Sequence, residues 1–288
     1  MIAIYKREFR SYFNSMIGYV FVAAVMAVIG IYFMLLNLNM GYPYFANSLS
    51  GTVTVFAFTV PLLTMKSMAE ERRSKSDQML LTYPVSVTSV VLGKFFAMLT
   101  VFAVPMLISC LCPLVLSSGG HGSLTIDYST ILMFMFLGAL FISIGMYVSS
   151  LTESQVIAAV GTMAVLLILI LWDTIIAYIP ATLNSSIIST LVIFALFALC
   201  YFASSKSIVP SVVIMVIGIV VTVVCATAFK DWFATGVTEL LALLSVHNVI
   251  ANFTSYYLFD VKGLLFYTII SALFIFLTIQ SVQKRRYR

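Results

Sequence analysis

Residues 66–86 read KSMAEERRSKSDQMLLTYPVS, and this charged stretch separates an apolar run at 51–66 from another at 88–117. The first of these runs contains TVTVFAF at 52–58, which alternates as a strand does. An isolated strand would leave its backbone groups unpaired in lipid, whereas a helix pairs them internally. The stretch therefore predicts a polar loop that joins two membrane-spanning helices.

The composition of the whole chain agrees with a membrane protein. Of its 288 residues, 62% are hydrophobic and only 9% are charged, whereas about a quarter of the residues are charged in a soluble domain. Such a chain cannot bury all its apolar surface in one globule, so the bilayer serves as its solvent. We expect an all-α, polytopic helix bundle that forms a single transmembrane domain over residues 1–288.

Apolar runs of about 20 residues mark the helices that can cross a bilayer. Eight spans are predicted, and six or seven are the alternatives because Pro180 and Pro210 lie at span boundaries. The segment 230–261 is expected to form a short external or re-entrant helical element. The predicted spans are 16–37, 51–66, 88–117, 128–149, 155–177, 186–204, 208–229 and 262–282.

The distribution of Lys and Arg predicts the orientation. With the N-terminus inside and eight spans, all of the 15 basic residues except Lys230 and Lys262 lie on the cytoplasmic side. We therefore expect both termini in the cytoplasm. The net charge of +5 is a topology signal, and it does not indicate nucleic-acid binding because no basic soluble module is present.

The N-terminal residues 1–15 predict a helix that lies in the membrane interface. Tyr5 and Phe9 share one face with other apolar side chains, whereas Lys6 and Arg10 lie on another face. Such a helix directs its basic side toward anionic headgroups. The alternative is that the segment is only a charged flank of the first span.

Few catalytic patterns occur in the sequence. The pair Glu70-Glu71 is similar to the EExxxR motif of intramembrane CAAX-type proteases, but Lys75 stands where Arg is needed. The histidine motifs of those proteases are missing, and no Walker A pattern is present. We expect no metal, catalytic residue or cofactor in this chain, so ATP and Mg²⁺ would be bound by a partner.

The charged loop itself contains a candidate docking helix from Glu70 to Leu81. Glu71 and Lys75 are spaced for an i, i+4 ion pair, and Ser86 or Thr88 is expected to cap the next span. A short helix of this kind can dock in a groove of a cytoplasmic partner, and a solvated connector is the alternative. Its apolar edge includes Met79, Leu80 and Leu81.

Several of these motifs resemble those of the ABC-2 type transporter permeases. Glu70-Glu71-Arg72 leads to QMLLTYPVS and then to VVLGK (Val90–Lys94), which is similar to the family pattern LLxxPVS followed by xxLGK. YKREFRSYF near the N-terminus and SSLTESQVIAA at 149–159 also resemble family segments. The resemblance covers residues 1–165 well, and the nearest branch is the gliding-motility-type permeases of bacterial exporters.

The resemblance implies a fold like that of the ABCA/ABCG exporters and a role as the permease subunit. Two permease chains, identical or different, would pair with two separate ATP-binding subunits in a bacterial plasma membrane. Residues 66–87 would carry the coupling helix, residues 1–15 the connecting helix, and Glu153 a second contact with the ATPase. An intramembrane protease and a non-transporting membrane scaffold remain alternatives. The apolar spans select no substrate among lipids, hydrophobic peptides and drug-like molecules.

Overall fold

The computed structural model groups the chain into two compact units, Met1–Ile170 with Val249–Arg288, and Leu171–Asn248. The residues that the structure describes are 1–73, 86–118, 123–178, 180, 182–205, 210, 212–213, 215–220, 222, 230–243 and 245–286.

The described part of the chain is helical and contains no strand, which confirms the predicted all-α membrane fold. Five helical segments within it are long and apolar enough to cross a membrane. Shorter apolar helices occur at Gln155–Ile170 and Leu183–Val192, and most of the predicted span 208–229 lies outside the described residues. The five long segments are Ile17–Asn39, Phe45–Arg73, Val87–Ser118, Leu124–Leu151 and Val261–Lys284.

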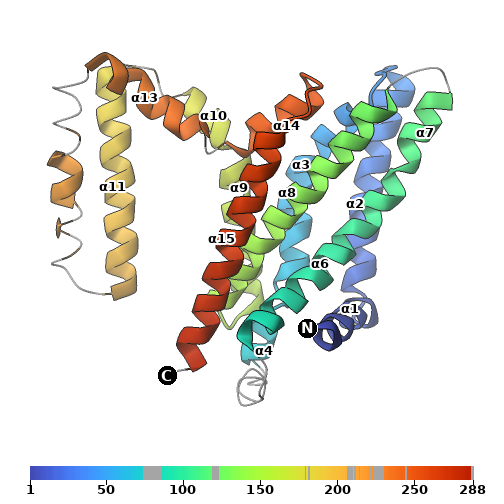
Figure 1. Cartoon of the computed structure of the whole chain (residues 1–288), viewed down its shortest axis with the longest axis horizontal. Helices are drawn as coiled ribbons and strands as arrows, with labels where there is room; N and C mark the ends of the chain where they lie inside the picture. Colours follow the sequence, from blue (N-terminus) through green and yellow to red (C-terminus); the bar gives the residue numbers. More distant parts are fainter. Residues whose placement is uncertain are drawn as a thin grey trace. The chain divides into compact units, whose positions relative to one another are not determined.

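The larger unit is a bundle in which α3 and α6 both pack against α8, and α15 packs along α8 as well. Figure 1 shows α1, α4 and the last residues of α15 at the same end of this bundle. Its helices are α1 (Ile2–Asn14), α2 (Ile17–Tyr32), the π-helix η1 (Phe33–Asn39), α3 (Phe45–Thr64), α4 (Ala69–Arg73), α6 (Val87–Ser109), α7 (Leu111–Ser118), α8 (Leu124–Leu151), α9 (Gln155–Ile170) and α15 (Val261–Arg286).

The helix α3 begins at Phe45, six residues before the span predicted at 51–66. Polar residues in its first turns lower the mean hydropathy there, so hydropathy alone does not assign this part of the helix to the span. Hydrogen bonds satisfy the polar groups around this helix start. The buried Asn37 side chain donates to the carbonyls of Tyr42 and Tyr44, just before α3, and accepts from Ser48 within it. The tertiary contacts, rather than hydropathy, therefore decide where this span starts.

Aromatic side chains fill the centre of the bundle. Phe102 on α6 lies between Phe21 on α2 and Phe56 on α3, with ring centroids 6.1 and 5.4 Å away. Gly138 on α8 faces the ring of Phe102 so closely that a Cβ there would collide with it. These contacts hold four helices together through packing alone, as expected where lipid provides no hydrophobic drive.

The smaller unit contains α10 (Trp172–Ala177), α11 (Leu183–Ser205) and α13 (Lys230–Leu243). The indole Nε1 of Trp172 donates to the carbonyl of Leu241 at 2.9 Å, which joins α10 to α13. With α14 (Val246–Thr254), α13 lies within the segment predicted to be an external helical element, at 230–261. The two helices agree with the helical part of that expectation, and the external location stays a prediction.

Candidate functional site: a polar cluster at one end of the bundle

The N-terminal helix α1 is tied to the bundle by its aromatic face. The hydroxyl of Tyr5 donates to Oγ1 of Thr100 on α6 at 3.1 Å, and Phe9 stacks on Tyr5. The hydroxyl of the buried Tyr12 donates to the carbonyl of Leu63 at 3.2 Å, and burial raises the pKa of this phenol. The apolar face of the predicted interfacial helix therefore packs on α6 and α3.

A glycine allows α1 to approach α6 closely. A Cβ at Gly93 would lie 3.2 Å from Cγ2 of Ile4 and 3.4 Å from the carbonyl oxygen of Met1. Because these distances are tighter than ordinary contacts, a larger side chain would push α1 away. This is a physical reason for the Gly in the VVLGK motif, which places Lys94 directly beside α1.

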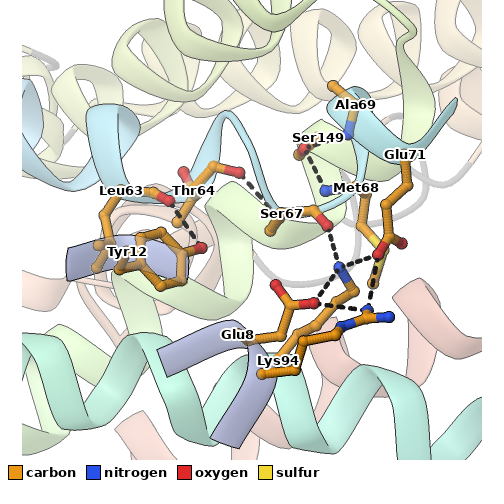
Figure 2. A network of polar contacts seen from close by, with 11 residues as sticks. Glu8, Tyr12, Leu63, Thr64, Ser67, Met68, Ala69, Glu71, Lys94 and Ser149 are labelled. Carbon is orange, nitrogen blue, oxygen red and sulfur yellow. Dashed lines mark hydrogen bonds and ion pairs between the residues drawn. The ribbon is translucent and has the colours of Figure 1, made fainter. Parts of the chain in front are cut away.

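Lys94 is the centre of the polar cluster. Its side chain is only 2% exposed, and its Nζ donates to the carbonyl oxygen of Ser67 at 2.7 Å. The same ammonium lies 2.8 Å from a carboxylate oxygen of Glu71 on α4 and 3.5 Å from one of Glu8 on α1. Figure 2 shows the two carboxylates converging on this ammonium beneath the Ser67 turn.

Arg7 completes the cluster from the solvent side. Its guanidinium lies 2.8 Å from Glu8 and 3.3 Å from Glu71, and the hydrogen bond with Glu8 raises the pKa of Arg7. A buried ammonium costs several kcal/mol unless its charge and its donors are all matched. Here two carboxylates and a carbonyl meet that requirement, so Lys94 links α6 to both α1 and α4.

A serine on α8 holds the start of the charged loop. The backbone N–H groups of Met68 and Ala69 both donate to Oγ of Ser149, at 3.3 and 3.1 Å. One turn before it on α8, Gly145 faces Thr64 so closely that a Cβ would collide with it. Gly145 therefore lets α8 lie against the end of α3, and Ser149 accepts hydrogen bonds from the turn that leads into α4.

Arg72 joins the charged loop to the turn after α8. One guanidinium nitrogen donates to the carbonyl of Ser150 at 3.2 Å, and the other lies 3.3 Å from the carboxylate of Glu153. The Glu153 side chain is 73% exposed, so solvent screens this pair and its contribution to stability is small. The contact nevertheless brings together two segments that the sequence assigned to the same partner.

The structure places the predicted site residues in three groups. Glu71, Arg72 and Glu153 take part in the contacts above, and Glu70 lies 3.7 Å from Lys66 in an i, i+4 pair. Lys6 and Arg10 are exposed on α1, opposite the packed side chains of Tyr5 and Phe9. The remaining predicted residues, Lys75, Met79, Leu80 and Leu81, lie outside the described residues.

Sequence reasoning missed the residue that connects these groups. Lys94 was counted as a cytoplasmic charge and as the last residue of the VVLGK motif, and no partner was predicted for it, although a Lys within an apolar run is expected to have a buried partner. Glu8 and Ser149 gave no comparable signal, because their roles depend on how α1 and α8 pack. The predicted cap is confirmed at Ser86, whose side chain accepts from the N–H of Ser89 at 3.4 Å.

The cluster contains no arrangement that indicates chemistry of its own. Within the described residues no group of three or more His, Cys, Asp or Glu side chains could hold a metal ion. The carboxylate of Glu71, which the protease alternative would require to be free, is engaged by Lys94 and Arg7. The arrangement links α1, α4 and α6 through one buried ammonium.

In a comparison with protein families, residues 2–279 match the model of the ABC-2 family transporter protein. The match extends well beyond residues 1–165, where the motifs are concentrated. No curated protein and no solved structure matches the chain. The gliding-motility-type branch stays a prediction. The motifs, the helical bundle and this nearly complete match identify the chain as a member of the ABC-2 transporter family, a multi-pass membrane permease.

Proposed function

We propose that this chain is the transmembrane subunit of an ATP-driven exporter whose ATP-binding subunit is a separate protein. The family supplies the class of protein, and the lack of a Walker A pattern in the given sequence supports a separate ATP-binding partner. Two permease chains would assemble with two ATP-binding subunits in a bacterial plasma membrane. The substrate is a molecule that the apolar spans alone do not specify.

The observation that carries the proposal is the linkage of α4 to three other helices. Lys94 ties α4 to α6 and α1, while Ser149 and the Arg72 contacts tie it to α8. Because packed elements of this kind shift as units, a displacement of α4 would move the ends of all these helices. We infer that ATP binding in the partner displaces this cluster and rocks the spans between inward-facing and outward-facing states.

The proposed docking surface consists of residues 66–87 and the turn around Glu153. Arg72 and Glu153 join these two segments, so a partner that contacts one also contacts the other. The ends of α1 and α15 lie at the same end of the bundle as α4 (Figure 1). This arrangement supports the orientation that the Lys and Arg distribution predicts, with both termini in the cytoplasm.

The test measures ATP hydrolysis after this chain is reconstituted with the ATP-binding protein encoded next to it, without added substrate. Coupling is the dependence of that hydrolysis on the permease. The variant Arg72→Glu should uncouple ATP hydrolysis from the permease. The double variant Arg72→Glu/Glu153→Arg should restore a substantial part of the coupling. Lys284→Glu is the matched control, because Lys284 is exposed at the end of α15 and lies outside the proposed docking surface. Equal coupling in all of these variants would refute the docking surface.

Two further variants probe the loop more severely. Charge reversal at Glu70 and Glu71, or Pro at Ser76, should abolish coupling if this segment docks as a helix. Peptide cleavage by the purified chain alone, lost on changing Glu70, would instead support an intramembrane protease. Association with a partner without any ATP-dependent change in the permease would support a scaffold.

A further inference from the structure

A basic groove lies beside α1 and includes Arg7 from the edge of the Lys94 cluster. It has a volume of about 760 Å³ and runs between α1 and the turn after α3. Its lining includes the side chains of Lys6, Arg7, Arg10 and Lys66, with Glu70 as the acidic member. A groove with four cations and one carboxylate is electrostatically matched to an anion.

Two of these cations have no ion-pair partner in the part of the chain that the structure describes. Lys6 and Arg10 form no ion pair within the described residues, whereas Lys66 pairs with Glu70 and Arg7 with Glu8 and Glu71. Lys6 and Arg10 are also spaced i, i+4 on α1, where like charges destabilise a helix. An anionic ligand between them would relieve this repulsion and use their unpaired donors.

An apolar pocket of about 150 Å³ adjoins the basic groove. The two cavities share Ser15, which lies where α1 turns into α2. Met16, in a left-handed backbone conformation with φ 59°, forms this sharp turn, and Gly18 permits it because a Cβ there would lie 3.1 Å from the Tyr12 carbonyl. The remaining lining is apolar: Met16, Ile17, Val20, Phe21, Leu62 and Met65.

A cationic groove that continues into an apolar pocket matches one ligand class better than a free anion. A soluble phosphate would use the groove and leave the exposed apolar side chains of Met16, Val20 and Leu62 uncovered. A glycerophospholipid has a negative phosphate next to an acyl chain, in the same order as the groove and the pocket. The site also lies at the beginning of α2, the first apolar span.

We propose that the groove and the pocket together form a binding site for an anionic phospholipid. Its phosphate lies between Lys6 and Arg10, and its acyl chain covers Val20 and Leu62. The bound lipid fastens α1 to the beginning of α2, on the side of α1 that does not contact α6. The groove shares Lys66 and Glu70 with the proposed docking surface, but the two cations assigned to the phosphate, Lys6 and Arg10, lie outside residues 66–87, so the lipid site does not rest on the proposed coupling.

The experiment is native mass spectrometry of the full-length chain with phosphatidylglycerol or phosphatidylcholine of identical acyl chains. The wild-type chain should retain phosphatidylglycerol preferentially. The variant K6Q/R10Q should bind it about 30-fold more weakly, because each cation near an anionic lipid contributes about a factor of five. The matched control K284Q/R285Q removes the same charge at the end of α15 and should bind as the wild type does.

The apolar half of the site is tested separately. Val20→Trp fills the pocket without changing charge, so it should also weaken phosphatidylglycerol binding, and inorganic phosphate should not displace the lipid. Displacement by phosphate with no effect of Val20→Trp would show an anion site only, which overturns the proposal. Equal weakening by K6Q/R10Q and K284Q/R285Q would show non-specific attraction, which also overturns it. Unchanged lipid binding with lost ATPase association in K6Q/R10Q would assign the groove to the protein partner instead.

Discussion

The ammonium of Lys94 on α6 lies 2.8 Å from the carboxylate of Glu71 on α4, a short helix within the charged loop that precedes α6. The carbonyl of Ser67 and the carboxylate of Glu8 complete its surroundings. Ser67 and Glu71 in the first part of the loop, and Glu8 on α1, therefore all contact the buried ammonium of Lys94, which lies in the helix after the loop. These contacts connect the loop to α6 and to the N-terminal helix.

Replacing Lys94 with Met should lower the free energy of unfolding by about 3 kcal/mol, since removal of one partner leaves the other charges without compensation. The double variant Lys94→Met/Glu71→Gln should recover part of this loss, because it also removes the carboxylate closest to the lost ammonium. Thermal unfolding in detergent measures both effects. Lys284→Met, at an exposed position, should change stability by less than about 0.5 kcal/mol. Identical behaviour of the Lys94 and Lys284 variants would mean that the cluster contributes nothing.

Adding one methyl group to Gly145 should destabilise the bundle by about 1–3 kcal/mol, because the Cβ collides with Thr64 on the neighbouring helix. Gly30→Ala is the matched control, since a Cβ at Gly30 meets nothing within 4 Å. That variant should be neutral or stabilise the helix by up to about 1 kcal/mol. The measurement compares the melting temperatures of the two variants in one detergent. A destabilised Gly30→Ala protein with an unaffected Gly145→Ala protein would contradict the close packing of α8 on Thr64.

Asn37 should be essential for the start of α3. Its buried amide donates to two backbone carbonyls and accepts from Ser48, so Asn37→Ala should cost about 1–3 kcal/mol by leaving those groups unsatisfied. Asn47→Ala serves as the control, because the described residues offer its half-buried side chain no hydrogen bond. Amide hydrogen exchange at residues 45–50 should accelerate in the Asn37 variant and remain unchanged in the control. Equal exchange in both variants would show that α3 begins without this amide.

Asp260 should make the start of α15 sensitive to acid. Partial burial raises the pKa of this carboxyl, but hydrogen bonds from the Gly263 N–H and the Asn252 amide, together with Lys262, outweigh burial and lower it. A lowered pKa means that the ionised group stabilises the fold above the unfolded value of about 3.9, and that this contribution is lost as the pH falls through the folded value. Asp260→Ala should therefore be less stable at pH 7 by about 1 kcal/mol, as expected for a lost helix cap.

The pH dependence distinguishes this electrostatic effect from simple loss of packing. The difference in melting temperature between the wild type and Asp260→Ala should shrink as the pH is lowered from 6 to below about 4. A difference that stays constant over this range would exclude the ionised carboxylate as its source.

Much of the bundle followed from local composition. The charged stretch at 66–86 and the apolar runs on either side were enough to predict membrane helices, since bilayer thickness and backbone pairing leave few alternatives. The ends of the helices were harder to predict from composition. The beginning of α3 at Phe45 depends on Asn37 and on Asp127, whose carboxylate accepts from the N–H of Ala46, and neither contact can be read from hydropathy.

The same division applies to the site. The sequence alone determined that residues 66–87 and Glu153 form polar connections between spans, and its motifs pointed to the permease family. Only the tertiary structure decided that Arg72 reaches Glu153 and that Lys94 is buried between Glu8 and Glu71. Those pairs join residues up to 86 positions apart, so they arise from helix packing, to which Gly93 and Gly145 contribute by allowing close approach. Composition fixes which segments enter the membrane, because that depends on each segment's own transfer free energy, whereas ion pairing between segments depends on their mutual distance.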